Sequence, residues 1–204
     1  MIIVFIGPPG AGKGTQASRL AHTLHVPHVA SGDLLRAVSA QGSPLGQEAK
    51  RYMDAGQLVP DELTLQIVEQ RLARPDAAAG VVLDGFPRTL QQARRLDDVL
   101  ARGRAHKVDA AIYIEAAREI VLERMRARRR DDETPEIQAK RYDVYEQDTA
   151  PLVAYYKERG VLAPVDGEQP IDTVTRDIAA AVTEHGDGAL TSAATATTTA
   201  RTHE

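Results

Sequence analysis

The chain of 204 residues contains no cysteine and no tryptophan, and only 4% of its residues are aromatic. Without cysteine the protein can form no disulfide, no thiolate nucleophile and no cysteine-based zinc site. A cysteine-free composition suits the reducing cytosol. The scarcity of aromatic rings disfavours a base-stacking platform for single-stranded nucleic acid. We therefore expect a cytoplasmic protein that does not use thiol chemistry.

Long apolar runs are absent too. None approaches the roughly 20 residues that a membrane-spanning helix needs. The apolar start, MIIVFIGPPG, lacks a basic region and runs into a glycine loop, so we do not expect a signal peptide. The formal net charge is −4, which disfavours a general nucleic-acid binder. We expect neither a membrane nor a nucleic acid as partner.

Positive charge is nevertheless concentrated in one stretch, RMRARRRDDE at 124–133. A solvated helix face, a nucleic-acid patch or a clamp for a small polyanion could each explain it. Arg124 and Arg128 are four residues apart and therefore share one face of a helix, whereas Arg126 points elsewhere. The cluster is short and acidic residues follow it, which disfavours the nucleic-acid patch.

Strand-like and helix-like segments alternate along the chain. Buried strands are expected near 2–6, 26–31, 80–84 and 108–116, with a last one in VLAPVDG (161–167), and helical patterns lie between them. A helix is expected to begin near Asp33, and one long helix to cover about 134–160, with Thr134 as its N-cap and Pro135 as its first residue. This order predicts an α/β fold, a doubly wound parallel sheet. Residues 186–204 are small and polar, which predicts a disordered tail.

GPPGAGKGT, at 7–15, fits the pattern of a phosphate-binding loop between a strand and a helix. Its glycines allow backbone N–H groups to point at phosphate oxygens, and the following helix adds its positive N-terminal end. Lys13 is placed to reach the β- and γ-phosphates, and the Thr15 hydroxyl to reach phosphate or Mg²⁺. We expect a nucleoside triphosphate to bind there, with a fold of the P-loop NTPase type. Asp84, at the end of the 80–84 strand, is the candidate that holds Mg²⁺ through water.

Further motifs make the pattern more specific: SGDLLRA (31–37), DAGQLVPDEL (54–63), LDGFPRTLQQA (83–93), QDTAPLVAYY (147–156) and VDG (165–167). Together with Gly10, Lys13, Gly14, Thr15 and Gln16, they resemble the adenylate kinases among the nucleoside monophosphate kinases. The resemblance covers residues 1–183 in order. It implies the reversible reaction Mg·ATP + AMP giving two ADP, which serves adenine nucleotide homeostasis and biosynthesis.

The resemblance also implies roles for individual residues. Gly10, Ala11, Gly12, Lys13, Gly14, Thr15, Arg124, Arg128 and Gly167 would bind ATP. Ser31, Arg36, Gln57, Leu58, Val59, Gly85, Arg88, Gln92, Arg130 and Arg141 would bind AMP. In this scheme Arg36 and Arg88 hold the AMP phosphate, for which a guanidinium is well shaped, and the Gln92 amide reads the adenine edge.

The same resemblance assigns catalysis to Lys13, Arg88, Arg124, Arg130 and Arg141. Arg129 is the alternative to Arg130, although only Arg130 lies eleven residues before Arg141, as in the family. Thr134–Pro135 rules out one continuous helix through this stretch, so 129–133 should be a hinge or a mobile flap. Asp132 and Glu133 sit where the family carries paired acids that help to close a lid.

The resemblance divides the chain into a core (1–30, 60–123 and 135–185), an acceptor-binding segment (31–60) and a very short lid (124–134). So short a lid lacks the inserted domain with four cysteines, and no structural zinc is expected. Ser31 replaces a threonine and keeps its hydroxyl. Pro164 stands where relatives often have lysine, which leaves the choice of donor base open.

Small nucleotides (ATP, AMP and ADP) are therefore the expected partners of a protein that the family suggests is a monomer. Two alternatives remain. A kinase for CMP or UMP would keep the fold, but Gln92 and Thr89 speak against it. A P-loop switch or ATPase would leave Arg36 and the GFPR motif (85–88) unexplained.

Overall fold

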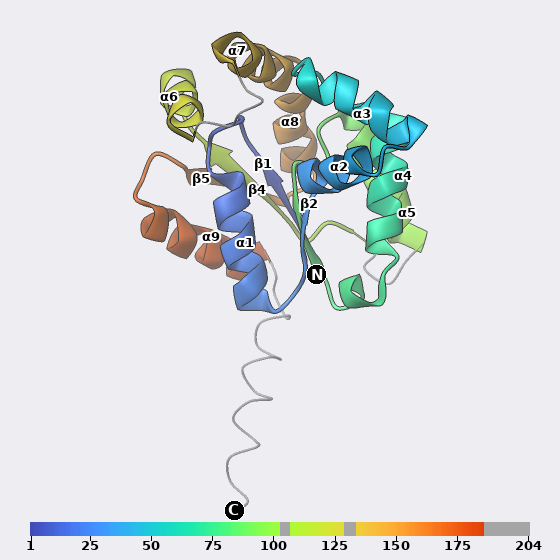
Figure 1. Ribbon diagram of the computed structural model, residues 1–204. Helices are drawn as coiled ribbons and strands as arrows, with labels where there is room; N and C mark the ends of the chain where they lie inside the picture. Colours follow the sequence, from blue (N-terminus) through green and yellow to red (C-terminus); the bar gives the residue numbers. More distant parts are fainter. Residues whose placement is uncertain (103–106, 129–133, 186–204) are drawn as a thin grey trace, which may run out of the picture.

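In a computed structural model the described residues are 1–102, 107–128 and 134–185. Their centre is a parallel sheet in the order β2-β3-β1-β4-β5. Helices cover both faces of this sheet (Figure 1). The α/β doubly wound parallel fold predicted from the sequence is confirmed. The strands are β1 (Ile2–Ile6), β2 (His28–Ala30), β3 (Val81–Asp84), β4 (Ala110–Glu115) and β5 (Leu162–Asp166).

Nine α-helices and two shorter helical turns lie within the described ranges. The α-helices are α1 (Lys13–Leu24), α2 (Ser31–Ala40), α3 (Pro44–Asp54), α4 (Asp61–Leu72), α5 (Leu90–Arg102), α6 (Arg118–Arg128), α7 (Pro135–Val144), α8 (Pro151–Glu158) and α9 (Ile171–His185). The two turns are the 3₁₀ turn η1 (Pro75–Ala77) and the π turn η2 (Tyr145–Thr149).

The β1 strand shows why the sheet lies at the centre. Its five side chains are all buried, and they alternate between two hydrophobic clusters. Ile3 and Phe5 pack with residues of α1 and α9, whereas Ile2, Val4 and Ile6 pack with residues of α5 and α8. Burying each such side chain contributes about 1.5–3 kcal/mol, so a continuous apolar run is stable only as an inner strand covered on both faces.

The α2–α3 hairpin stands beside the sheet rather than on it (Figure 1). It has a small apolar cluster of its own, in which Leu35 and Ala49 meet Val59 and Leu63. The Ser43 side chain caps α3 by accepting a hydrogen bond from Gly46 N at 3.1 Å. Residues 31–60 are thus held together by local packing.

The long helix predicted over 134–160 is wrong in one respect. The chain forms α7, then the π turn η2, then α8. Ala150 N donates to Tyr145 O, five residues back, at 2.9 Å. Pro151 has no N–H to donate, and its ring would clash with the carbonyl four residues earlier, so the helix widens just before it. The α2 helix begins at Ser31, two residues earlier than the sequence suggested.

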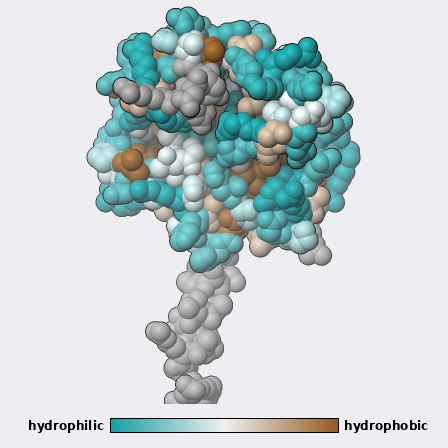
Figure 2. All heavy atoms as spheres, viewed as in Figure 1, coloured by the Kyte–Doolittle hydropathy of each residue, from teal (hydrophilic) through white to brown (hydrophobic). Residues whose placement is uncertain are grey.

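The face of the molecule in Figure 2 is mostly hydrophilic, and hydrophobic residues appear on it only as small separate patches. The described ranges contain no helix whose length and apolar character would let it cross a membrane.

Candidate active site

One cleft of about 590 Å³ opens at the carboxyl ends of the strands. In open α/β sheets this edge is where ligands bind. The segments after β1, β2 and β3 all supply residues to it. Seventeen residues predicted for the site line the cleft: Gly10, Gly12, Lys13, Gly14, Thr15, Ser31, Arg36, Gln57, Leu58, Val59, Asp84, Gly85, Arg88, Gln92, Arg124, Arg128 and Arg141.

The phosphate loop connects β1 to α1. Gly10 and Gly12 have φ of +90° and +96°, in the region that favours glycine. The Lys13 ammonium donates to Gly7 O and to Pro8 O, each at 2.7 Å, and so folds back over the loop. Burial lowers the pKa of Lys13 to about 8, and the charges of Arg88, Arg141 and Arg128 act in the same direction, against the opposing effect of Asp84.

Asp84 ends β3 and lies opposite Phe5 of β1 and Ala30 of β2. Its Oδ2 is 3.7 Å from His28 Nε2. Burial alone would raise the pKa of Asp84, but the His28 ring and the Lys13 ammonium lower it more, so the pKa lies below its ordinary value. Asp84 is therefore a carboxylate at neutral pH.

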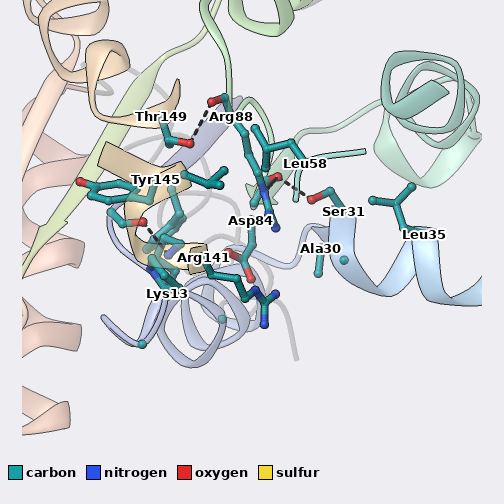
Figure 3. A pocket seen from close by; sticks show the side chains of 18 of the residues that line it. Lys13, Ala30, Ser31, Leu35, Leu58, Asp84, Arg88, Arg141, Tyr145 and Thr149 are labelled. Atoms are coloured by element: carbon teal, nitrogen blue, oxygen red, sulfur yellow. Dashed lines mark hydrogen bonds between the residues drawn. The ribbon is translucent and has the colours of Figure 1, made fainter. Parts of the chain in front are cut away.

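Arg88 and Ser31 meet at one backbone carbonyl (Figure 3). Ser31 Oγ donates to Gly85 O at 2.5 Å, and Arg88 Nε donates to the same oxygen at 2.7 Å. Gly85 has φ of +70°, and a Cβ there would lie 2.7 Å from Arg88 Nη2, so a larger residue would strain the backbone and displace the guanidinium. Thr149 Oγ1 donates to Arg88 O at 2.9 Å. Burial lowers the pKa of Arg88 from its usual value, with Asp84 opposing.

Gln92 lies one helical turn beyond Arg88, and only 1% of it is exposed. Its Oε1 accepts from Arg88 N at 2.7 Å, and its Nε2 donates to Asp61 Oδ1 at 2.7 Å. The Thr89 hydroxyl donates to the other oxygen of Asp61 at 2.7 Å. Gln92 of α5, and Thr89 just before this helix, are thus tied to the first residue of α4.

The arginines of the cleft come from four parts of the chain: α2, the segment before α5, α6 and α7. Arg124 Nη1 donates to Gly167 O at 2.8 Å, while Arg128 and Arg141 face the cleft from α6 and α7. The exposed Arg36 pairs with Asp33 on the same helix. In Figure 3 Lys13, Asp84, Arg88 and Arg141 converge on one space.

Some predicted residues do not line the cleft. Ala11 is buried, and Gly167 contacts Arg124 through its carbonyl without lining the cleft itself. Arg130 and its alternative Arg129 lie outside the described residues, as do Asp132 and Glu133.

No role was predicted from the sequence for several residues of this region. His28, Tyr145 and Thr149 line the cleft, and Asp61 holds Gln92. Asp61 lies in the motif DAGQLVPDEL (54–63), in which the resemblance gave roles only to Gln57, Leu58 and Val59. His28 sits within a short strand that showed no pattern of its own. In the described ranges, no group of three or more His, Cys, Asp or Glu side chains is arranged to hold a metal ion.

Comparison with known proteins supports the resemblance over most of the chain. The family model for adenylate kinase matches residues 5–161. "Adenylate kinase 1" of Synechocystis sp. is 46% identical over 176 residues, which cover 86% of this chain and 94% of the relative. "Adenylate kinase" of Mycolicibacterium paratuberculosis is 48% identical over 174 residues (85% and 94%), and that of Xanthomonas campestris pv. campestris is 45% identical over 186 residues (89% and 99%). The chain belongs to the adenylate kinase family.

Proposed function

We propose that this protein catalyses the reversible transfer of the terminal phosphoryl group of Mg·ATP to AMP, which gives two ADP. One observation carries the proposal. The phosphate loop, Asp84 and the Arg88–Gln92 segment all line the same cleft. A donor and an acceptor nucleotide bound at these two places would meet at their phosphates. Family membership supports the same reaction, and nothing in the comparisons favours a switch, an ATPase or a pyrimidine kinase.

Alignment would provide much of the catalysis. The attacking group is an oxygen of the AMP phosphate, which is already ionised at neutral pH, so no strong general base is required. Holding the attacking and leaving oxygens in line makes the step effectively unimolecular. The loop backbone and Lys13 would fix the donor, and Arg88 with Arg36 would fix the acceptor phosphate.

Positive charge would stabilise the transferring group. Lys13, Arg124, Arg128 and Arg141 line the cleft, and we assign this role to them and to Arg130. Fixed cations that need not reorganise during the reaction are the strongest means of stabilising such a charge. Arg36, which pairs with Asp33, must exchange that carboxylate for the AMP phosphate.

Asp84 fits a hydrated magnesium ion. Mg²⁺ keeps several waters and takes one or two carboxylates together with substrate phosphates, so a single ionised carboxylate beside the phosphate loop suffices. The Thr15 hydroxyl lies on the same cleft. Adenylate kinases generally use Mg·ATP, in which the ion neutralises phosphate charge. We expect no structural zinc.

Different segments of the chain would form different parts of the cleft. We assign the AMP site to residues 31–60 with the Arg88–Gln92 segment, and the lid to 124–134. Gln57, Leu58 and Val59 would border the adenine. Substrate charge should draw the two segments together, because the cations repel one another without it. Closure would exclude water and so suppress ATP hydrolysis.

We further propose a cytoplasmic monomer. The large exposed hydrophobic residues of the described ranges are Leu45, Leu90 and Ile171, which sit on three different helices. Scattered side chains of this kind do not form the apolar patch of an obligate interface.

An acceptor panel tests the proposed function. ADP formation is followed from Mg·ATP with AMP, CMP, UMP, GMP or no acceptor. ADP that appears mainly with AMP supports an adenylate kinase. Preference for CMP or UMP would overturn the acceptor assignment, and equal ADP without any acceptor would indicate an ATPase or a switch.

A further inference from the structure

The Asp61 carboxylate joins two helices that border the cleft. It is the first residue of α4, and its two oxygens accept from the Thr89 hydroxyl and the Gln92 amide, each at 2.7 Å. The Thr89 oxygen in turn accepts from Gln92 N at 3.1 Å, which closes a ring of hydrogen bonds. The positive end of α4 favours a carboxylate at this position. None of these contacts involves the phosphate chemistry.

This ring fixes which way the Gln92 amide points. Asp61 accepts and so requires the Nε2 side, while Arg88 N donates and so requires the Oε1 side. A reversed amide would place an oxygen against a carboxylate and an N–H against an N–H. Both contacts would then be repulsive, in a place where Gln92 is almost completely buried.

A fixed amide offers the cleft a fixed pattern. A glutamine amide has two N–H donors and two acceptor lone pairs, and the protein uses one of each. One N–H on the Asp61 side and one lone pair on the Arg88 side remain for a ligand. Because Gln92 lines the cleft, a base there meets a donor and an acceptor in a set order.

Two classes of purine differ in whether their hydrogen-bonding edge matches the Gln92 amide. A 6-aminopurine offers an acceptor at N1 beside a donor at its amino group. A 6-oxopurine offers the reverse, a donor at N1–H beside an acceptor at O6. The amide can pair with both edges only if it can turn over, and Asp61 and Arg88 N together prevent that.

We propose that Asp61 is a positioning residue that sets selectivity for the acceptor base. By fixing the Gln92 amide, it favours a 6-aminopurine monophosphate over a 6-oxopurine monophosphate. The inference rests on the proposed function, in which Gln92 reads the base of AMP. It adds a residue that does not touch the base but decides which base is read.

The test uses Asp61→Asn, which keeps the size of the side chain and removes the requirement for a donor. Glu62→Gln is the matched control, because Glu62 is an exposed acid in the same helical turn and its replacement also removes one charge.

The values of kcat/KM for AMP and for IMP are measured at saturating Mg·ATP. The AMP/IMP ratio should fall roughly tenfold in D61N, the discrimination that one bidentate amide pair supplies, mainly through a higher KM for AMP. Glu62→Gln should leave the ratio unchanged. An equal loss for both acceptors in D61N would make Asp61 merely structural and overturn the proposal.

A second readout separates this inference from the proposed function. The Gln92 side-chain amide is followed by ¹⁵N NMR in the nucleotide-free protein. Its protons should exchange slowly in the wild type and faster in D61N, whatever reaction the protein catalyses. No ADP formation from AMP by the wild type would refute the proposed function, whereas normal AMP use with an unchanged AMP/IMP ratio in D61N refutes only this inference.

If D61N does not fold, Thr89→Val provides a second variant. It removes one hydrogen bond to the same carboxylate and should lower the AMP/IMP ratio as well. An unchanged ratio there also overturns the proposal.

Discussion

The Lys13 ammonium is held by two backbone carbonyls in a cleft that already carries arginines. Burial is the main reason that its pKa falls from 10.5 to about 8. Between these values the unfolded chain binds more protons than the folded chain, so the contribution of Lys13 to the free energy of unfolding rises with pH. Its charge, by contrast, is lost over the same window, and in the proposed function ATP binding requires that charge.

ATP affinity should therefore depend on pH through Lys13. Bound phosphates favour the charged amine, so ATP binding above pH 8 must be accompanied by proton uptake. The dissociation constant of Mg·ATP, measured by calorimetry from about pH 7 to about pH 9.5, should increase as the pH passes the pKa of Lys13, by at most about tenfold per pH unit. Lys13→Met should bind weakly with little pH dependence, and Lys157→Met, which removes an exposed lysine, should behave like the wild type. A flat profile for the wild type would contradict the assignment.

Arg88 should serve the acceptor and not the donor. Arg88→Ala removes the guanidinium beside Gly85 and leaves the phosphate loop in place. We expect kcat/KM for AMP to fall by roughly 100-fold, as for the loss of a charge-assisted phosphate contact, while the dissociation constant of ATP stays nearly unchanged. Arg95→Ala is the control, since Arg95 lies in α5, a short distance after Arg88 in the chain, but pairs with Glu69 at the surface. Turnover that stays normal and saturates with AMP would rule out this role.

The sequence could predict those site residues whose neighbours in the site are also close to them along the chain. Lys13 belongs to a loop whose spacing determines its geometry, and Arg88 and Gln92 lie one helical turn apart. The Asp61–Gln92 bond joins residues 31 positions apart. Asp61 is the first residue of α4, where an acid is favoured for local reasons, so nothing in the sequence pointed across to α5.

At the scale of elements, the phosphate loop is fitted to the helix beside it. A Cβ on Gly10 would lie 2.5 Å from Val121 O of α6, whereas a Cβ on Gly12 would meet nothing within 4 Å. Both glycines have a positive φ. Both positions would therefore strain the backbone of a larger residue, but only a side chain at Gly10 would also collide with a neighbouring helix.

Alanine at these two positions separates strain from packing. Gly12→Ala should cost about 1–2 kcal/mol of unfolding free energy through strain alone. Gly10→Ala should cost about 1–3 kcal/mol more, because the loop must also move away from α6. Urea unfolding of the two variants measures the difference. Equal losses would mean that the contact with Val121 is unimportant.

The helical region of α7, η2 and α8 shows the limits of local prediction. The sequence pattern predicted one helix from 134 to 160, and the helical region of the structure begins and ends within two residues of those positions. The π turn was not foreseen, because its cause is Pro151 within a stretch that otherwise favours helix. This turn carries Tyr145 and Thr149 into the cleft, so the irregular element is part of the site.

At the scale of the whole molecule, the parallel sheet and the position of the site followed from the alternation of strands and helices. The strand order did not follow, since β3 inserts between β1 and β2. That insertion brings Asp84 beside both the phosphate loop and Ser31. The lid assignment, with Arg130 at its centre, stays a prediction, because 129–133 lie outside the described residues.

In the proposed function, one cleft binds two nucleotides with their phosphates adjacent. Incubation with Mg²⁺ and ADP as the sole nucleotide is the decisive measurement. We predict that ATP and AMP appear in equal amounts until equilibrium is reached, and that Arg88→Ala slows both equally. ADP that stays unchanged, or that yields AMP and phosphate without ATP, would rule out transfer between two bound nucleotides.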